Sequence, residues 1–128
     1  MERIIKTLKS NLRASMLFLA VLGLVALLLS SCSSSEGRSL AKQACTYVNQ
    51  SISNYNKGSK SKNPQIQHQY LNKAYVELRA AEPLAAAAAG DDPTWQALAT
   101  TVSESSRVPE KYLIHALIDE CTAVNSES

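Results

Sequence analysis

The spacing of apolar residues constrains the fold of this 128-residue chain more than any other feature. From residue 41 onward, apolar residues recur in a 4-3-4-3 rhythm at Ala41, Cys45, Val48, Ile52 and Tyr55. Because an α-helix turns once every 3.6 residues, this rhythm places all of them on one face of an amphipathic helix. Gly58 follows the stripe, and since glycine commonly ends helices, we expect this helix to end there.

A second helix is predicted to begin at Asn63-Pro64, because asparagine caps helix starts and proline suits the first turn. Its apolar stripe is Leu71, Ala74, Leu78, Ala81 and Ala85. Pro83 lacks a backbone donor and crowds the preceding turn, so we expect a kink or a break there. The alanine run that follows is predicted to stay helical up to Gly90. Its small side chains favour a tight helix contact, with a partner-facing groove as the alternative.

Two more helices are predicted, one starting at Asp91-Asp92-Pro93 and one at Pro109. Their buried faces are Trp95, Leu98, Ala99 and Val102 in the third, and Leu113, Ile114, Leu117, Cys121 and Val124 in the fourth. No segment alternates with period two for long enough to be a strand. The sequence therefore predicts an all-α domain, a small four-helix bundle-like fold over residues 38–128.

The first 31 residues have the parts of a secretory signal peptide. A basic start (Arg3, Lys6, Lys9 and Arg13) precedes the apolar run 16–29, which is shorter than the roughly 20 residues that a membrane span needs. The exit, Leu29-Ser30-Ser31-Cys32, resembles the lipobox of bacterial lipoproteins. This resemblance implies a diacylglyceryl group on Cys32 and cleavage before it. An ordinary cleaved signal or an uncleaved anchor is the alternative, but both leave the position of Cys32 unexplained.

The expected organisation follows from this signal. Residues 1–31 are the lipoprotein signal peptide, residues 32–37 are the lipidated cysteine and a flexible tether without apolar residues, and 38–128 are the helical domain. Two or more acyl chains hold a protein stably on a bilayer. We therefore expect the chain to be lipid-anchored on the extracytoplasmic face of the cell membrane.

The charge balance gives no reason to expect nucleic acid or an anionic membrane surface as a partner. Four of the thirteen basic residues and one of the eleven acidic residues precede Cys32, which leaves nine and ten and a net charge near −1. Lys57, Lys60 and Lys62 form a small basic loop. We interpret it as solvated, with contact to phosphate head groups beside the anchor as the alternative.

Three cysteines suggest one disulfide, because lipidation uses Cys32 and leaves Cys45 and Cys121. In an oxidising compartment such a pair most often forms a bridge, although two buried free thiols are the alternative. Short loops would make the first and fourth helices antiparallel, and this brings the two cysteines to the same end of the bundle.

No catalytic or metal site is predicted. His68 has no ligand partner nearby in sequence, and His115 has only Asp119 one turn later, which is too few ligands for a metal. Asp91 and Asp92 are explained by helix capping. We expect no catalytic residue, no metal ligand and no cofactor.

The segment from Trp95 to Glu110, with the flanking cysteines, is similar to small lipoproteins of high-GC Gram-positive bacteria, a family that brings no activity to transfer. The leading hypothesis is a non-enzymatic, membrane-anchored surface lipoprotein that binds another envelope protein or organises the envelope. The alternative is a small-ligand-binding lipoprotein with a pocket between helices near Trp95 and Pro83.

Overall fold

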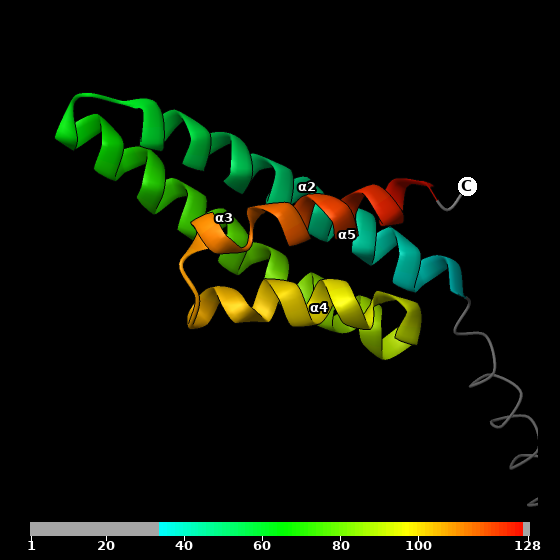
Figure 1. Ribbon diagram of the computed structural model, residues 1–128. Helices are drawn as coiled ribbons and strands as arrows, with labels where there is room; N and C mark the ends of the chain where they lie inside the picture. The colour runs from blue at the N-terminus through cyan, green and yellow to red at the C-terminus, as the bar shows by residue number, and fades with distance from the viewer. Residues whose placement is uncertain (1–33, 127–128) are drawn as a thin grey trace, which may run out of the picture. The chain divides into compact units, whose positions relative to one another are not determined.

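The structure is a computed structural model that describes residues 34–126 (Figure 1). Within this range lie four α-helices: α2 (Ser34–Lys60), α3 (Pro64–Asp91), α4 (Gln96–Ser103) and α5 (Ile114–Ser126). Three short 3-10 turns connect the later helices, namely η1 (Pro93–Trp95), η2 (Glu104–Ser106) and η3 (Glu110–Tyr112). The described residues contain no strand, so the all-α prediction is confirmed.

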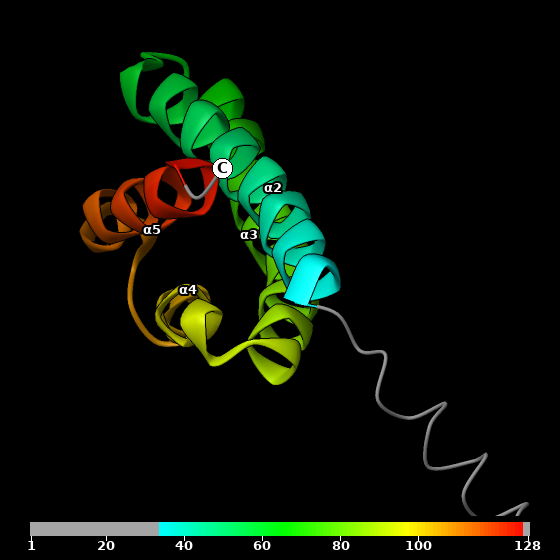
Figure 2. The ribbon, with the colours of Figure 1, turned by 90° about the vertical axis from the view of Figure 1, so that its right-hand side faces the viewer.

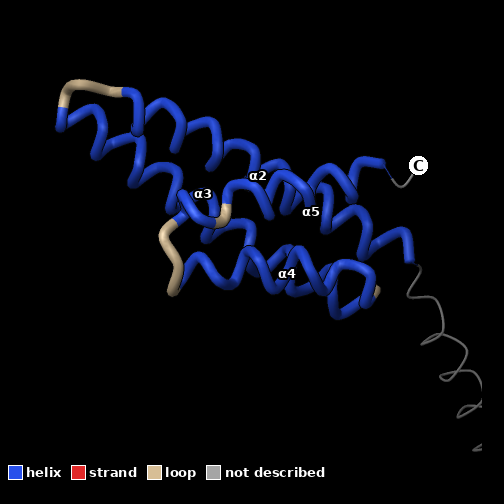
Figure 3. Tube along the Cα trace, viewed as in Figure 1, coloured by secondary structure: helices blue, strands red, loops and turns tan. Residues whose placement is uncertain are grey.

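The long helices α2 and α3 form an antiparallel hairpin, and the two shorter helices lie together on one side of it (Figure 2). α4 packs mainly on α3, and α5 packs mainly on α2. Because α4 and α5 are short, they cover only the half of the hairpin that holds the start of α2. The other half extends beyond them as a pair of helices joined by a short loop (Figure 3). We call this part, residues 53–73, the arm.

The predicted apolar stripes form the core of the covered half. The buried cluster contains expected residues from each of the four helices, among them Val48, Leu78, Leu98 and Leu117, each at most 1% exposed. The predicted stripe residues Tyr55 and Leu71, which lie in the arm, are only half-buried and do not belong to this cluster. Trp95 belongs to the same cluster. The bundle-like domain with one core is thus present, although the core does not extend along the whole hairpin.

A second buried face of α2 consists of small residues that let α3 approach closely. A Cβ atom added to Gly37 would lie 3.2 Å from the carbonyl oxygen of Ala88, and one added to Gly58 would lie 3.0 Å from the side chain of Leu71. Between these two points, the Oγ of Ser51 lies 2.7 Å from the carbonyl oxygen of Ala74. The two helices therefore pack tightly from one end of the hairpin to the other.

This packing corrects the prediction that Gly58 ends the first helix. α2 continues to Lys60, and Gly58 is a buried helical residue. None of the described glycines has a positive φ. Glycine is needed at position 58 because Leu71 and Tyr70 leave little room for a side chain.

Two other expectations change in part. Of the kink or break expected at Pro83, the break is absent, because α3 runs through Pro83, which lies on its exposed side. Ser34–Gly37, which were predicted to belong to a flexible tether over 32–37, form the first turn of α2. Gly37 is buried against the end of α3, and this contact holds the turn on the domain.

The helix starts follow the predicted capping chemistry. The Oδ1 of Asn63 accepts hydrogen bonds from the backbone N–H groups of Gln65 (2.9 Å) and Ile66 (3.2 Å). The Oδ1 of Asp92 accepts one from Thr94 at 2.9 Å, which starts η1 before α4. Hydrogen bonds from the backbone N–H and the side chain of Thr94 hold the pKa of Asp92 below its usual range. Pro109 precedes η3, so the last α-helix begins later than predicted, at Ile114.

Residues 1–33, with the predicted signal peptide and Cys32, lie outside the described residues. Among the helices that are described, none has the length and apolar character required to span a bilayer.

Candidate functional site

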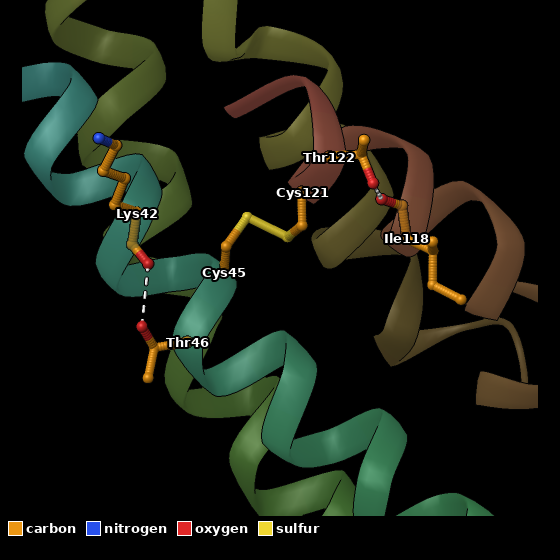
Figure 4. Close-up of a disulfide and its surroundings, with 6 residues drawn as sticks. All are labelled: Lys42, Cys45, Thr46, Ile118, Cys121 and Thr122. Atoms are coloured by element: carbon orange, nitrogen blue, oxygen red, sulfur yellow. Dashed lines mark hydrogen bonds between the residues drawn. A yellow bond between two sulfur atoms is a disulfide. The ribbon is translucent and has the colours of Figure 1, made fainter. Parts of the chain in front are cut away.

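The predicted disulfide between Cys45 and Cys121 is present in the structure (Figure 4). It joins α2 to α5 with a Cα–Cα distance of 5.4 Å, and both residues are buried. The neighbouring hydroxyls of Thr46 and Thr122 donate to carbonyls of their own helices, those of Lys42 and Ile118. The bridge is therefore a structural link inside the core. The predicted lipidation site, Cys32, lies outside the described residues.

The two histidines are not brought together. His68 is exposed on the arm, and His115 is exposed on α5. Within residues 34–126 no group of three or more metal-ligating side chains forms. Trp95 is only 4% exposed and packs in the core, where a pocket had been the alternative prediction.

The arm is the part of the domain with the strongest charge. It carries Lys57, Lys60, Lys62 and Lys73 and no acidic residue. This is part of a wider division, because residues 37–76 contain six basic residues and no acid, whereas 77–128 contain three basic and nine acidic residues. A net charge near −1 therefore hides two regions of opposite sign.

The positions of these lysines are only partly explained by helix stability. Lys57 and Lys60 lie in the last turn of α2, where a positive charge interacts favourably with the helix dipole. Lys62 lies just before the start of α3, and the first turn of α3 holds no acid. A positive charge there opposes the dipole of α3 and destabilises it. The tip of the arm therefore concentrates positive charge at a local cost in stability.

Apolar and aromatic groups lie among these charges. Ile66 is 43% exposed, and the ring of the half-buried Tyr70 lies one turn further along α3. The Nζ of Lys57 lies 5.9 Å from the centre of that ring. A shallow hollow lies between Ile66, Gln69, Tyr70 and Lys73. One face of the arm therefore combines an exposed aliphatic group, an aromatic ring and ammonium groups.

A buried polar cluster lies where the arm meets the covered half. Ser51 is fully buried, and its Oγ lies 2.6 Å from Oε1 of Glu110 in η3. The side-chain amide of Asn54 donates to Glu77 at 2.6 Å. Burial raises the pKa of Glu110, the hydrogen bond to Ser51 lowers it in part, and the charge of Glu77 raises it further. The cluster links α2, α3 and η3 at the base of the arm.

A serine beside a carboxylate could suggest a nucleophile with its base, but the geometry does not support catalysis. The hydroxyl of Ser51 is 0% exposed and also contacts the carbonyl of Ala74, so a substrate has no access to it. Nucleophilic catalysis also requires a charge stabiliser that faces the same cavity. We therefore regard the cluster as structural, and the arm as the candidate functional surface.

No protein-family model, curated protein or solved structure matches this chain. The arm must therefore be interpreted from its own residues. The sequence signal for the arm is the stretch 37–76, which contains no acidic residue. The net charge of the whole domain does not show this stretch, because the acidic residues elsewhere cancel its positive charge. Ser51 and Glu110 could not be paired from the sequence, because they are 59 residues apart and neither belongs to an apolar stripe.

Proposed function

We propose that this chain is a non-enzymatic surface lipoprotein, anchored through Cys32, whose helical domain acts as an interaction or envelope-organising module. The observation that carries the proposal is the arm, which extends beyond α4 and α5 with exposed lysines and Ile66. None of the arm residues 53–73 belongs to the buried core cluster, so the arm is not explained by the packing of this core. The lipobox-like Leu29-Ser30-Ser31-Cys32 supports the anchor.

The start of α2 limits how far the proposed lipid anchor can lie from the helical domain. α2 begins at Ser34, two residues after Cys32, so a lipid on Cys32 lies within about 7 Å of chain from the folded domain. With 27 residues, α2 is about 40 Å long. Lys60 at its far end is therefore remote from the anchor along the helix, so head-group contact beside the anchor requires the domain to lie along the membrane.

The packing of Trp95 in the core disfavours the small-ligand alternative. The leading proposal is tested in two parts, the first of which concerns the anchor. Cells that express the full chain or Cys32→Ala are labelled with a fatty-acid analogue. We expect label on the wild type only. We expect the variant to leave the membrane fraction and to appear as an unprocessed precursor or in a soluble pool. Equal labelling of both proteins would contradict the anchor.

The second part tests the arm in cells. A photoreactive amino acid replaces Ile66 in one protein and Ile118 in the other, since both side chains are 43% exposed in the wild type. We expect covalent adducts with an envelope component from position 66 and far fewer from position 118. Equal yields at both positions would show that the arm is not a preferred contact surface.

A further inference from the structure

We propose that the arm docks on an anionic lipid surface, with its lysines at the phosphate groups and Ile66 and Tyr70 in the head-group region. The inference deepens the proposed envelope role and depends on the lipid anchor only for the orientation of the domain. Its first support is electrostatic. The ion pairs of the described residues, Arg79–Glu82 and Arg107–Glu104, both lie outside the arm.

The lysines of the arm thus have no acidic partner among the described residues. Lys57, Lys60, Lys62 and Lys73 are all exposed. Their ammonium groups can reach a surface together, because lysine side chains are long and flexible. Anionic bilayers attract such clusters, and each lysine near the surface strengthens binding about fivefold.

The second support is the position of apolar groups among these charges. Ile66, Tyr70 and Lys73 border the same shallow hollow, and Lys57 lies over the Tyr70 ring. A soluble polyanion offers phosphate groups but no apolar layer behind them. A bilayer offers both, and tyrosine is favoured at the boundary between them. The combination of groups therefore favours a lipid surface over a soluble polymer.

The third support is shape. The tip of the arm is a short loop between two helix ends, and it projects away from α4 and α5 (Figure 1). Because α4 and α5 do not cover it, the arm can meet a flat surface along its side without a conformational change. If Cys32 carries a lipid, the chain has two membrane contacts at opposite ends of α2. The hairpin would then lie along the bilayer instead of standing on it.

The experiment measures binding of residues 33–128 to lipid vesicles by cosedimentation. This fragment is a separate compact unit whose buried core lies entirely within it, and it lacks the proposed anchor. Vesicles contain either phosphatidylcholine alone or phosphatidylcholine with phosphatidylglycerol. We expect binding to the anionic vesicles at low ionic strength, weakening as salt is added, because salt screens charges between exposed groups.

Two matched pairs of variants test the surface. Lys60→Gln with Lys62→Gln removes two charges from the arm, whereas Lys42→Gln with Lys111→Gln removes two exposed charges elsewhere. We expect the arm pair to weaken binding about 25-fold and the control pair about twofold or less. Ile66→Ser should weaken binding about fivefold. Ile118→Ser, at an equally exposed position, should leave it unchanged.

Three outcomes would overturn the proposal. The first is equal binding to neutral and anionic vesicles, and the second is an equal loss from both lysine pairs. The third is full competition by soluble polyphosphate combined with no effect of Ile66→Ser, which would identify a soluble polyanion as the ligand. Because the fragment carries no lipid, these results are independent of the labelling experiment on Cys32.

Discussion

The hydroxyl of Ser51 in α2 lies 2.6 Å from a carboxyl oxygen of Glu110 in η3. The same hydroxyl lies 2.7 Å from the carbonyl oxygen of Ala74 in α3. A hydroxyl has one proton, and a carbonyl oxygen can only accept. When Glu110 is ionised, one of these short contacts therefore has no hydrogen. When Glu110 is protonated, it donates to Ser51, Ser51 donates to Ala74, and both contacts become hydrogen bonds.

This arrangement predicts a pH-dependent stability. Because the pKa of Glu110 is raised above its ordinary value of 4.5 in the folded protein, folding favours its protonated form. The stabilisation is complete at pH values below 4.5 and is lost as the pH rises through the raised pKa. We expect Glu110→Gln to keep the hydrogen bond to Ser51 without a charge and to stabilise the protein at pH 7 by up to about 1 kcal/mol.

Urea unfolding from pH 4 to pH 8 measures this difference. The free energy of unfolding should depend less on pH in Glu110→Gln than in the wild type. Glu120→Gln, which changes a carboxylate outside the cluster, is the control. If the two variants change the pH dependence equally, the pH dependence does not arise from a raised pKa of Glu110.

The disulfide predicts a second, larger effect. Removing a bridge between positions 76 residues apart frees the unfolded chain and should lower the stability by roughly 4 kcal/mol. We expect this loss in the Cys45→Ser, Cys121→Ser double variant and after reduction of the wild type. Thermal unfolding of residues 33–128 provides the measurement. Two free thiols in the unreduced, denatured protein would contradict the bridge.

The close contact of α2 and α3 predicts opposite effects at two glycines. A Cβ at position 58 would lie 3.0 Å from Leu71 and 3.1 Å from the Cβ of Tyr70, whereas a Cβ at position 90 would meet nothing within 4 Å. Alanine in place of glycine favours a helix by up to about 1 kcal/mol. We expect Gly90→Ala to stabilise by about 0.5 kcal/mol and Gly58→Ala to destabilise by about 1 kcal/mol, because of overpacking.

Chemical denaturation of both variants under the same conditions tests this pair. Both substitutions replace a helical glycine by alanine. The difference between their effects on the free energy of unfolding therefore measures the steric contacts of the added Cβ atom. Equal stabilisation by both substitutions would show that α3 can move away from α2 without cost.

The last prediction concerns the histidines. Both are exposed and lie on different elements, so His68→Ala and His115→Ala, alone or together, should change stability by less than about 0.5 kcal/mol. Membrane or partner binding should also stay intact. If either substitution abolished function while the circular dichroism and melting temperature were unchanged, the non-enzymatic proposal would have to be abandoned.

The sequence predicted the parts of the fold that depend on bulky apolar residues and helix caps. Val48, Leu78 and Leu117 are buried as their spacing indicated, and Asn63 caps α3 as expected. The face of α2 toward α3 was missed, because Gly37, Ser51 and Gly58 are small or polar and do not contribute to an apolar stripe. Such residues are recognised only when the opposite helix is in place.

The arm was missed for a different reason. The expected helices already differed in length, but a bundle around one core implies that all four cover each other. A short run of lysines predicts a solvated loop, and the net charge near −1 gives no reason to expect an anionic membrane surface. Their separation from the acidic residues becomes informative once α2 and α3 are known to extend beyond α5, since the charge then lies on a projecting surface.

The link between α2 and α5 also determines what happens when the backbone is cut. A protease would most easily reach exposed residues such as Lys62 and Asn63 in the loop at the tip of the arm. Because Cys45 precedes this loop and Cys121 follows it, a single cut anywhere between them leaves both fragments covalently joined. Such a nicked molecule would run as one species on a non-reducing gel and separate into two only after a thiol is added.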